Sequence, residues 1–146
     1  MCRICSLSWF IPMLVIISCQ DAADNYVKIE PAHLEHVEGT DLHELTLTEK
    51  AVERLDIRTS EVYLELIEHS EARERLVVPY SSIIYDSHGH VWVYTNSEPL
   101  TYVRHEVKVD FIEGNIAVLH DGPPVGTKVV TVGAAELYGT EYEVGH

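Results

Sequence analysis

The chain has 146 residues, a mass of 16.5 kDa and a mean hydropathy of −0.01, which suits one domain with a core and is too little for two ordinary domains. Its formal net charge of −14 comes from 10 Lys and Arg against 24 Asp and Glu. Such an acidic chain repels polyphosphate, which excludes nucleic-acid binding through a basic patch. The sequence has no apolar run of about 20 residues that would span a bilayer. It also lacks a glycine-rich phosphate loop, a GxSxG motif and an HExxH motif, which argues against the commonest enzyme classes.

The N-terminal segment has the pattern of an export signal. One positive charge, Arg3, precedes a nearly unbroken apolar run over residues 7–17. Residues 16–19, two aliphatics followed by Ser and Cys, resemble the lipobox of bacterial lipoproteins. The resemblance implies a signal peptide over residues 1–18, cleavage before Cys19 and lipid attachment to its sulfur. The alternative is an ordinary signal peptide in which Cys19 is incidental.

The cysteine count agrees with a lipid anchor. No cysteine follows Cys19, so the mature chain has neither a disulfide nor a thiolate metal site. The anchor would place the protein on the periplasmic side of a bacterial envelope. Gln20 follows the cysteine and Asp21 comes one residue later, whereas the enteric retention signal has Asp directly after the cysteine. The outer membrane is therefore favoured slightly over the inner one.

The mature chain divides into a tether and a domain. Residues 19–41 are polar and acidic without sustained periodicity, which predicts a flexible tether. Residues 42–146 form the expected domain. It begins with a short strand over 43–48 and a short helix over 49–55, for which Thr46 and Thr48 are alternative N-caps.

The remaining elements are mostly strands. A strand is expected over residues 57–64, and the charged residues 65–75 fit either a hairpin crossing or a frayed helical turn. Further strands and turns alternate at regular spacing; the strands are expected over 76–79, 83–85, 90–94, 102–112, 116–119 and 128–132. In the long strand 102–112, Arg104, Glu106, Lys108 and Asp110 would face solvent, with His105 on the apolar face. The pattern predicts a mainly β fold, a small antiparallel barrel or roll with one short helix.

Several of these segments resemble the periplasmic adaptor subunits, or membrane fusion proteins, of RND-type efflux pumps. The similar segments occur in the family's order: Leu45–Thr59, Val78–Tyr85, Trp92–Tyr94 and Asp121–Gly133. The resemblance covers about 100 residues and is limited to the membrane-proximal β domain. Only 11 residues, 65–75, stand where a full adaptor carries a lipoyl-like domain and a long helical hairpin.

The resemblance implies a lipid-anchored, non-enzymatic, adaptor-like domain that contributes to export. Its partners would be the RND transporter or the full-length adaptor, with no nucleic acid and no cofactor beyond the lipid on Cys19. Adaptors meet the transporter through loops of this domain. We therefore expect partner contacts at two turns, through His88, His90, Pro123 and Pro124. An acidic structural lipoprotein without a transport role is a further alternative.

The histidine content supports a different class of function. Asp86, His88 and His90 are three possible metal ligands in and beside one turn, which suggests a periplasmic metal-binding lipoprotein. The simpler interpretation is a solvated hairpin tip in which Asp and Gly form the turn. His33, His36 and His43 are a second possible set, located mainly in the expected tether. We find no catalytic constellation.

Overall fold

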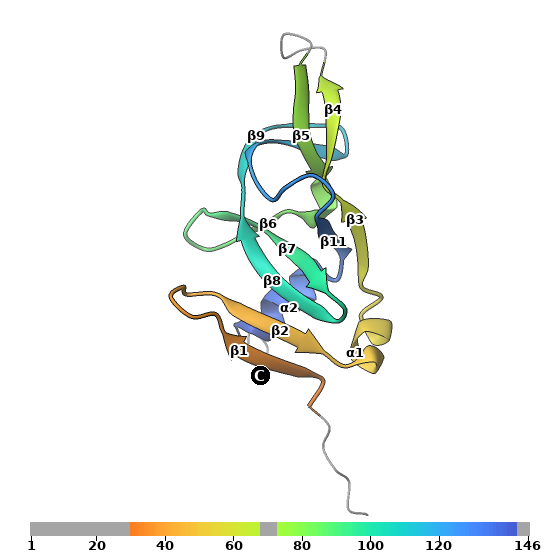
Figure 1. The fold of residues 1–146 in the computed structure, drawn as a ribbon, viewed down its shortest axis with the longest axis vertical. Helices are drawn as coiled ribbons and strands as arrows, with labels where there is room; N and C mark the ends of the chain where they lie inside the picture. The colour runs from red at the N-terminus through yellow and green to blue at the C-terminus, as the bar shows by residue number, and fades with distance from the viewer. Residues whose placement is uncertain (1–29, 68–72, 143–146) are drawn as a thin grey trace, which may run out of the picture.

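The computed structural model describes residues 30–67 and 73–142, which form two antiparallel β-sheets, two short α-helices and one 3-10 turn (Figure 1). The predicted mainly β class is confirmed. Neither sheet closes on itself within the described residues, so a roll describes the fold better than a barrel. In the same part of the chain, neither helix combines the length and the apolar character needed to cross a bilayer.

The first sheet has seven strands in the order β1–β2–β8–β7–β11–β3, with β6 also paired to β7. Its strands are β1 (Ala32–His36), β2 (His43–Leu47), β3 (Arg58–Glu61), β6 (Ile84–Tyr85), β7 (Val91–Glu98), β8 (Thr101–Glu106) and β11 (Lys128–Val132). The predicted hairpin around residues 86–89 is present as the pairing of β6 with β7.

The second sheet has four strands in the order β4–β5–β10–β9. Its strands are β4 (Tyr63–Ile67), β5 (Arg73–Pro79), β9 (Lys108–Glu113) and β10 (Ile116–Asp121). Between the alternatives for residues 65–75, the structure has the hairpin: β4 and β5 pair antiparallel, and residues 68–72 lie outside the described part. The 3-10 turn η1 (Tyr80–Ser82) follows β5.

The chain crosses between the sheets at two buried valines. Val62 separates β3 from β4, and Val107 separates β8 from β9; the two residues are 1% and 3% exposed. The prediction of one continuous strand over 102–112 is therefore wrong. It also assigned the wrong face to part of that segment, since Arg104 is buried and His105 is exposed. The break at Val107 changes the sheet and the face, and simple alternation cannot follow it.

The N-terminal boundary of the domain also differs from the expectation. Residues 32–41, expected as tether, form β1 and the turn into β2, with Leu34 opposite Leu45. Ala32 and Leu34 pack at the rim of a core cluster, which gives this short strand its apolar side. The sequence did not predict this strand, because its apolar alternation extends over only five residues in a polar, acidic segment. The expected signal peptide, Cys19 and tether residues 19–29 lie outside the described residues.

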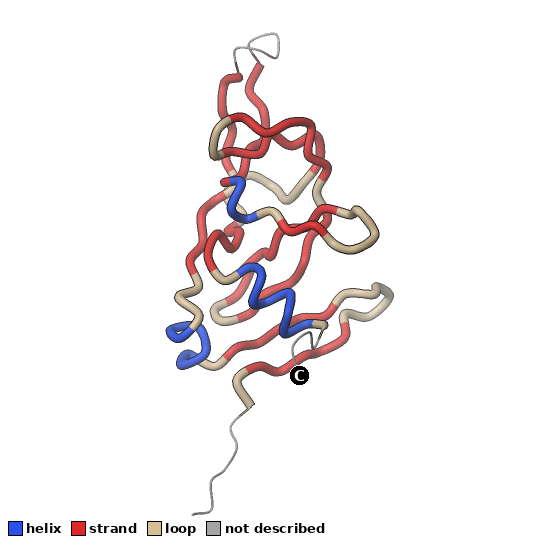
Figure 2. Tube along the Cα trace, turned by 180° about the vertical axis from the view of Figure 1, so that it is seen from behind, coloured by secondary structure: helices blue, strands red, loops and turns tan. Residues whose placement is uncertain are grey.

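Two helices lie against the first sheet. In α1 (Glu49–Arg54), Thr48 is the N-cap, because its Oγ1 accepts a hydrogen bond from the Ala51 N–H at 3.2 Å. The second helix, α2 (Ala134–Glu141), has no counterpart among the predicted elements. Seen from behind, it lies across the sheet, in contact with β2 and β7 (Figure 2).

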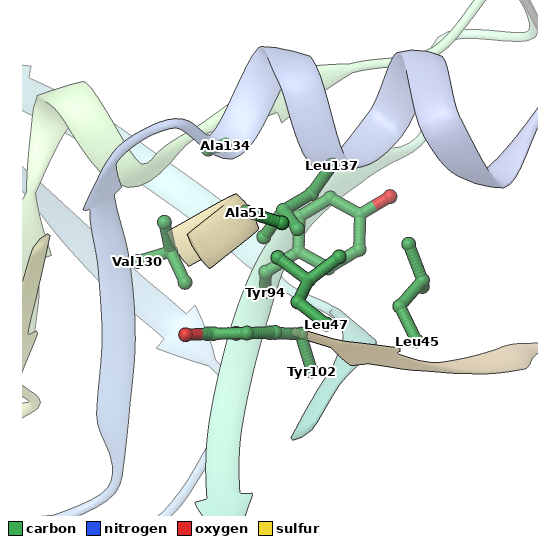
Figure 3. Packing of buried hydrophobic residues seen from close by; sticks show 8 residues of the cluster. All are labelled: Leu45, Leu47, Ala51, Tyr94, Tyr102, Val130, Ala134 and Leu137. Carbon is green, nitrogen blue, oxygen red and sulfur yellow. The ribbon is translucent and has the colours of Figure 1, made fainter. Parts of the chain in front are cut away.

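The core has two main parts with different surroundings. The first cluster is formed by side chains of β2, β7, β8 and β11 together with side chains of α1 and α2. Its members are Leu45, Leu47, Ala51, Tyr94, Tyr102, Val130, Ala134 and Leu137 (Figure 3). The second cluster joins the two sheets and contains Val62, Val78, Ile83, Val93, Val107, Ala117, Leu119 and Val129. Tyr94 of the first cluster donates a hydrogen bond to Glu141, one of the buried charged residues described with the functional site below.

Candidate functional site

The turn between β6 and β7 is organised by one carboxylate. The Asp86 side chain is only 8% exposed, and its Oδ1 accepts hydrogen bonds from the backbone N–H groups of His88 at 2.8 Å and His90 at 2.9 Å. Its Oδ2 accepts from Trp92 Nε1 at 3.1 Å and lies 3.0 Å from His90 Nδ1. Both oxygens are thus committed to holding the turn, and Gly89, at φ +89°, completes it.

The same contacts fix the charge of the turn. Desolvation raises the pKa of Asp86, but the hydrogen bonds from Trp92, from the backbone of His90 and His88 and from the His90 ring outweigh it. The pKa of this carboxyl therefore lies well below its ordinary value. Asp86 stays ionised throughout the neutral range and acts as an acceptor inside the turn.

The geometry does not support the predicted metal site at this turn. In residues 30–67 and 73–142, no group of three His, Cys, Asp or Glu side chains is arranged to hold a metal ion. The rings of His88 and His90 stack with centroids 6.2 Å apart, and both Asp86 oxygens already have donors. Asp86, His88 and His90 form a hydrogen-bonded turn. The second set is also not assembled, although His36 and His43 face each other across β1 and β2.

The side chains that this turn exposes to solvent are the imidazoles of His88 and His90. His88 is exposed and the His90 side chain is 55% exposed. The His90 ring meets Trp92 edge to face at 6.2 Å. Below it, the Arg104 guanidinium lies 4.5 Å from the Trp92 ring centroid and 5.0 Å from that of Tyr142, a cation held between two aromatic faces.

Arg104, whose guanidinium lies between Trp92 and Tyr142, also forms a buried ion pair with Glu141. Arg104 Nε donates to Glu141 Oε2 at 2.8 Å, and the two side chains are 4% and 0% exposed. Tyr94 also donates to Glu141 Oε2, at 2.6 Å. Burial, the hydrogen bond to Glu141 and the charge of Glu141 all raise the pKa of Tyr94, so its hydroxyl remains a donor. A continuous series of contacts thus joins the hairpin tip to α2.

The other carboxylate oxygen of Glu141 is buried without a hydrogen-bond partner. It faces His43, whose Nδ1 lies 3.7 Å away on a side chain that is 40% exposed. Sequence reasoning missed both Arg104 and Glu141. The alternation of Tyr102 with Arg104 could have suggested a shared buried face, whereas nothing in the sequence around Glu141 marks it as buried.

The second turn expected to bind a partner is built differently. Pro123 is among the fully buried side chains, so its predicted contact with a partner is wrong. It faces the interior because the segment after β10 folds over the sheet: the Gly126 N–H donates to the Val62 C=O at 2.8 Å, and the Val62 N–H donates to the Thr127 C=O at 2.8 Å. Pro124 and Val125 are exposed in this turn.

Comparison with known proteins gives one fold likeness. No protein-family model and no curated protein matches the chain. The structure is similar to the NMR structure of a 180-residue fragment encompassing the N-terminal metal-binding site and the membrane-proximal domain of SilB from Cupriavidus metallidurans CH34. The TM-score is 0.44 at 21% sequence identity, over 66% of this chain and 53% of that one. The chain thus spans about half the length of that fragment.

Proposed function

We propose that this chain is a non-enzymatic, adaptor-like accessory domain of an RND-type efflux system. The observation that carries the proposal is the sequence of adaptor-like segments together with their places in the fold. Val78–Tyr85 runs from the end of β5 through η1 into β6, and Asp121–Gly133 leads through the second turn into β11. Between β4 and β5, a short hairpin takes the place at which a full adaptor carries further domains.

The proposed docking surface is the β6–β7 turn, residues 86–90. Its backbone is fixed by the four contacts of Asp86, so little conformational entropy is lost when a partner binds. Its exposed groups are the His88 and His90 rings. Pro124 is proposed as an additional contact from the second turn.

Attachment to the membrane is assigned to lipid on Cys19. The domain itself is acidic and would be repelled by anionic headgroups, so its own surface does not explain membrane binding. The Cys19→Ser variant should leave the membrane fraction when envelopes are separated from soluble protein. Retention of that variant on the membrane after signal removal would refute the lipid anchor. The proposed side is periplasmic, with the outer membrane favoured.

Docking is tested by photocrosslinking in intact envelopes. A photoreactive residue replacing His88 should yield adducts with an RND transporter or its adaptor, identified by mass spectrometry. The matched control replaces His105, an exposed histidine near the end of β8 in the same sheet. Equal labelling from both positions, or adducts without any efflux component from position 88, would contradict the proposal.

A further inference from the structure

The outer edge of β1 is an open hydrogen-bonding edge in the described structure. β1 pairs with β2 alone, and no other described strand pairs with it. Two backbone hydrogen bonds lie at the ends of its ladder with β2: the Thr48 N–H donates to the Pro31 C=O at 3.1 Å, and the Val37 N–H donates to the Leu42 C=O at 3.0 Å. In an antiparallel pair, hydrogen-bonded residues alternate with residues that point away.

This alternation identifies the groups on the open edge. His33 and Glu35 bond toward β2, so the N–H and C=O groups of Ala32, Leu34 and His36 point away from it. Leu47 agrees with this phase, because its N–H donates to Leu100 on the far side of β2. Three donors and three acceptors therefore lie along one short, regular strand.

Other sheet edges carry features that oppose pairing. β3 and β9 each have a register irregularity with their neighbour. Antiparallel self-pairing of β4 about its centre would place Glu65 opposite Glu65, a like-charge contact. β1 has no bulge in its pairing with β2, and no proline or lysine within it. It is the least protected of these four edges.

We propose that β1 pairs antiparallel with β1 of a second copy of this chain, about a two-fold axis at Leu34. In this register the outward groups of Leu34 bond to those of the other Leu34, and Ala32 bonds to His36 in both directions. The arrangement forms six backbone hydrogen bonds. Registers shifted by two residues along the strand lose bonds, and one of them places Glu35 opposite Glu35.

The side chains are complementary in the same register. His33 of one copy lies opposite Glu35 of the other in a non-hydrogen-bonded pair, where side chains approach most closely. Within its own hairpin, Glu35 stands opposite Glu44, an unfavourable like-charge pair. An imidazole from the second copy supplies a hydrogen-bond donor beside Glu35.

Charged groups also lie near the ends of the two hairpins. A groove of about 750 Å³ lies where β1 begins, and its lining includes two cations of α1, Lys50 and Arg54, and one carboxylate, Glu49. Because the second copy's His36 lies opposite Ala32, its β1–β2 turn, which carries Glu38 and Asp41, continues past this groove. A short strand pair is a small interface, so we expect a weak dimer in solution that confinement to a membrane strengthens.

The test uses disulfide formation between two full-length copies. One copy carries His33→Cys and the other Glu35→Cys, on exposed positions whose Cα atoms would lie within disulfide range. We expect a linked dimer only when both copies are present. Mass spectrometry of the linked peptides separates this bond from bonds of Cys2, Cys5 or Cys19. The control pair is Leu64→Cys with Leu66→Cys on β4, which has the same spacing and should not link.

A charge exchange checks that the link reflects association. His33→Glu should abolish the concentration-dependent dimer seen by sedimentation, and adding Glu35→Lys should restore it, which a misfolded variant cannot do. Absence of the 33–35 link with both copies in one membrane, linking by either variant alone, or linking by the β4 pair at the same yield would each overturn the proposal. The proposed dimer does not depend on an efflux partner. A failure of this test would therefore leave the proposed docking through the β6–β7 turn unaffected, and the reverse also holds.

Discussion

The two turns expected to bind a partner both begin with Asp and contain Gly, but they differ in how they are held in place. The β6–β7 turn is fixed by hydrogen bonds that the backbone N–H groups of His88 and His90 donate to the Asp86 carboxylate, and both imidazoles are exposed. The segment after β10 is fixed by packing: Pro123 is buried, and a Cβ on Gly122 would lie 2.8 Å from Leu119 Cδ1. The first turn is exposed and contacts the polar network of Arg104, Tyr94 and Glu141 through Trp92, whereas the second turn covers the core between the two sheets.

This difference shows how buried polar and apolar groups divide the tasks in one small domain. The cluster that joins the two sheets is apolar and contributes stability through burial. The network beneath the first turn contains an ion pair, whose burial is costly and whose net contribution to stability is small. We infer that the network fixes the position of α2 and the hairpin rather than adding stability.

The largest expected effect comes from removing one partner of the ion pair. Arg104→Met should destabilise the protein by about 3–5 kcal/mol in urea unfolding, because it leaves the Glu141 carboxylate buried without its cation. The double variant Arg104→Met with Glu141→Leu should recover most of this loss, since the unpaired charge is gone. If the double variant were as unstable as the single one, the network would be a source of stability and the comparison would fail.

For the second turn, the corresponding variant creates a cavity in the core next to the turn, at Leu119 of β10. Leu119→Ala beneath Gly122 should cost about 3 kcal/mol, because a fully buried leucine is truncated between the sheets. The measurement is again urea unfolding, with Ile112→Ala on an exposed position of β9 as the control. A cost similar to the control would mean that this segment does not close the core.

The two turns should respond alike where only backbone strain is changed. Gly89 at φ +89° and Gly126 at φ +86° both have open space where a Cβ would be placed. Gly89→Ala and Gly126→Ala should therefore each cost about 1–2 kcal/mol, the penalty for an L residue in this conformation. Thermal unfolding of both variants tests this. A clearly larger loss at only one of them would show that its turn depends on more than backbone conformation.

Acid should weaken the first turn selectively. The pKa of Asp86 is lower in the folded protein than in the unfolded chain, so its contribution is complete above the unfolded value of about 3.9 and is lost as pH falls toward the folded value. The stability difference between the wild type and Asp86→Asn should therefore be largest near neutral pH and shrink below about pH 4. Urea midpoints at pH 7 and pH 3 measure it. A difference that grows on acidification would contradict the assigned role of Asp86.

Much of the fold could be predicted because its signals are local. The β6–β7 hairpin follows from apolar strands around an Asp- and Gly-containing turn, and Thr48 caps α1 through its own side chain. α2 was not predicted because it has a weak apolar stripe and depends on contacts with β2 and β7, which are distant in sequence. β1 likewise depends on its pairing with β2.

The candidate site was predicted only in part, for the same reason. His88 and His90 could be selected from the turn sequence, and they are exposed as expected. Pro123 was expected at the surface because it lies in a turn and binding residues are commonly on loops. It is buried where the segment after β10 forms backbone hydrogen bonds with Val62, which is distant in sequence. The partnership of Arg104 with Glu141 spans 37 residues and leaves no local trace.

The most direct measurement of the central claim changes only the exposed imidazole that does not contact Asp86. His88→Asp should alter stability by no more than about 0.5 kcal/mol, because His88 is an exposed turn position. The matched control, His105→Asp, makes the same change in charge at another exposed histidine of the domain. We predict that the His88 variant loses co-purification with the RND component from envelope extracts and that the control variant retains it. Unchanged co-purification of the folded His88 variant would contradict the assignment of this turn as the docking surface.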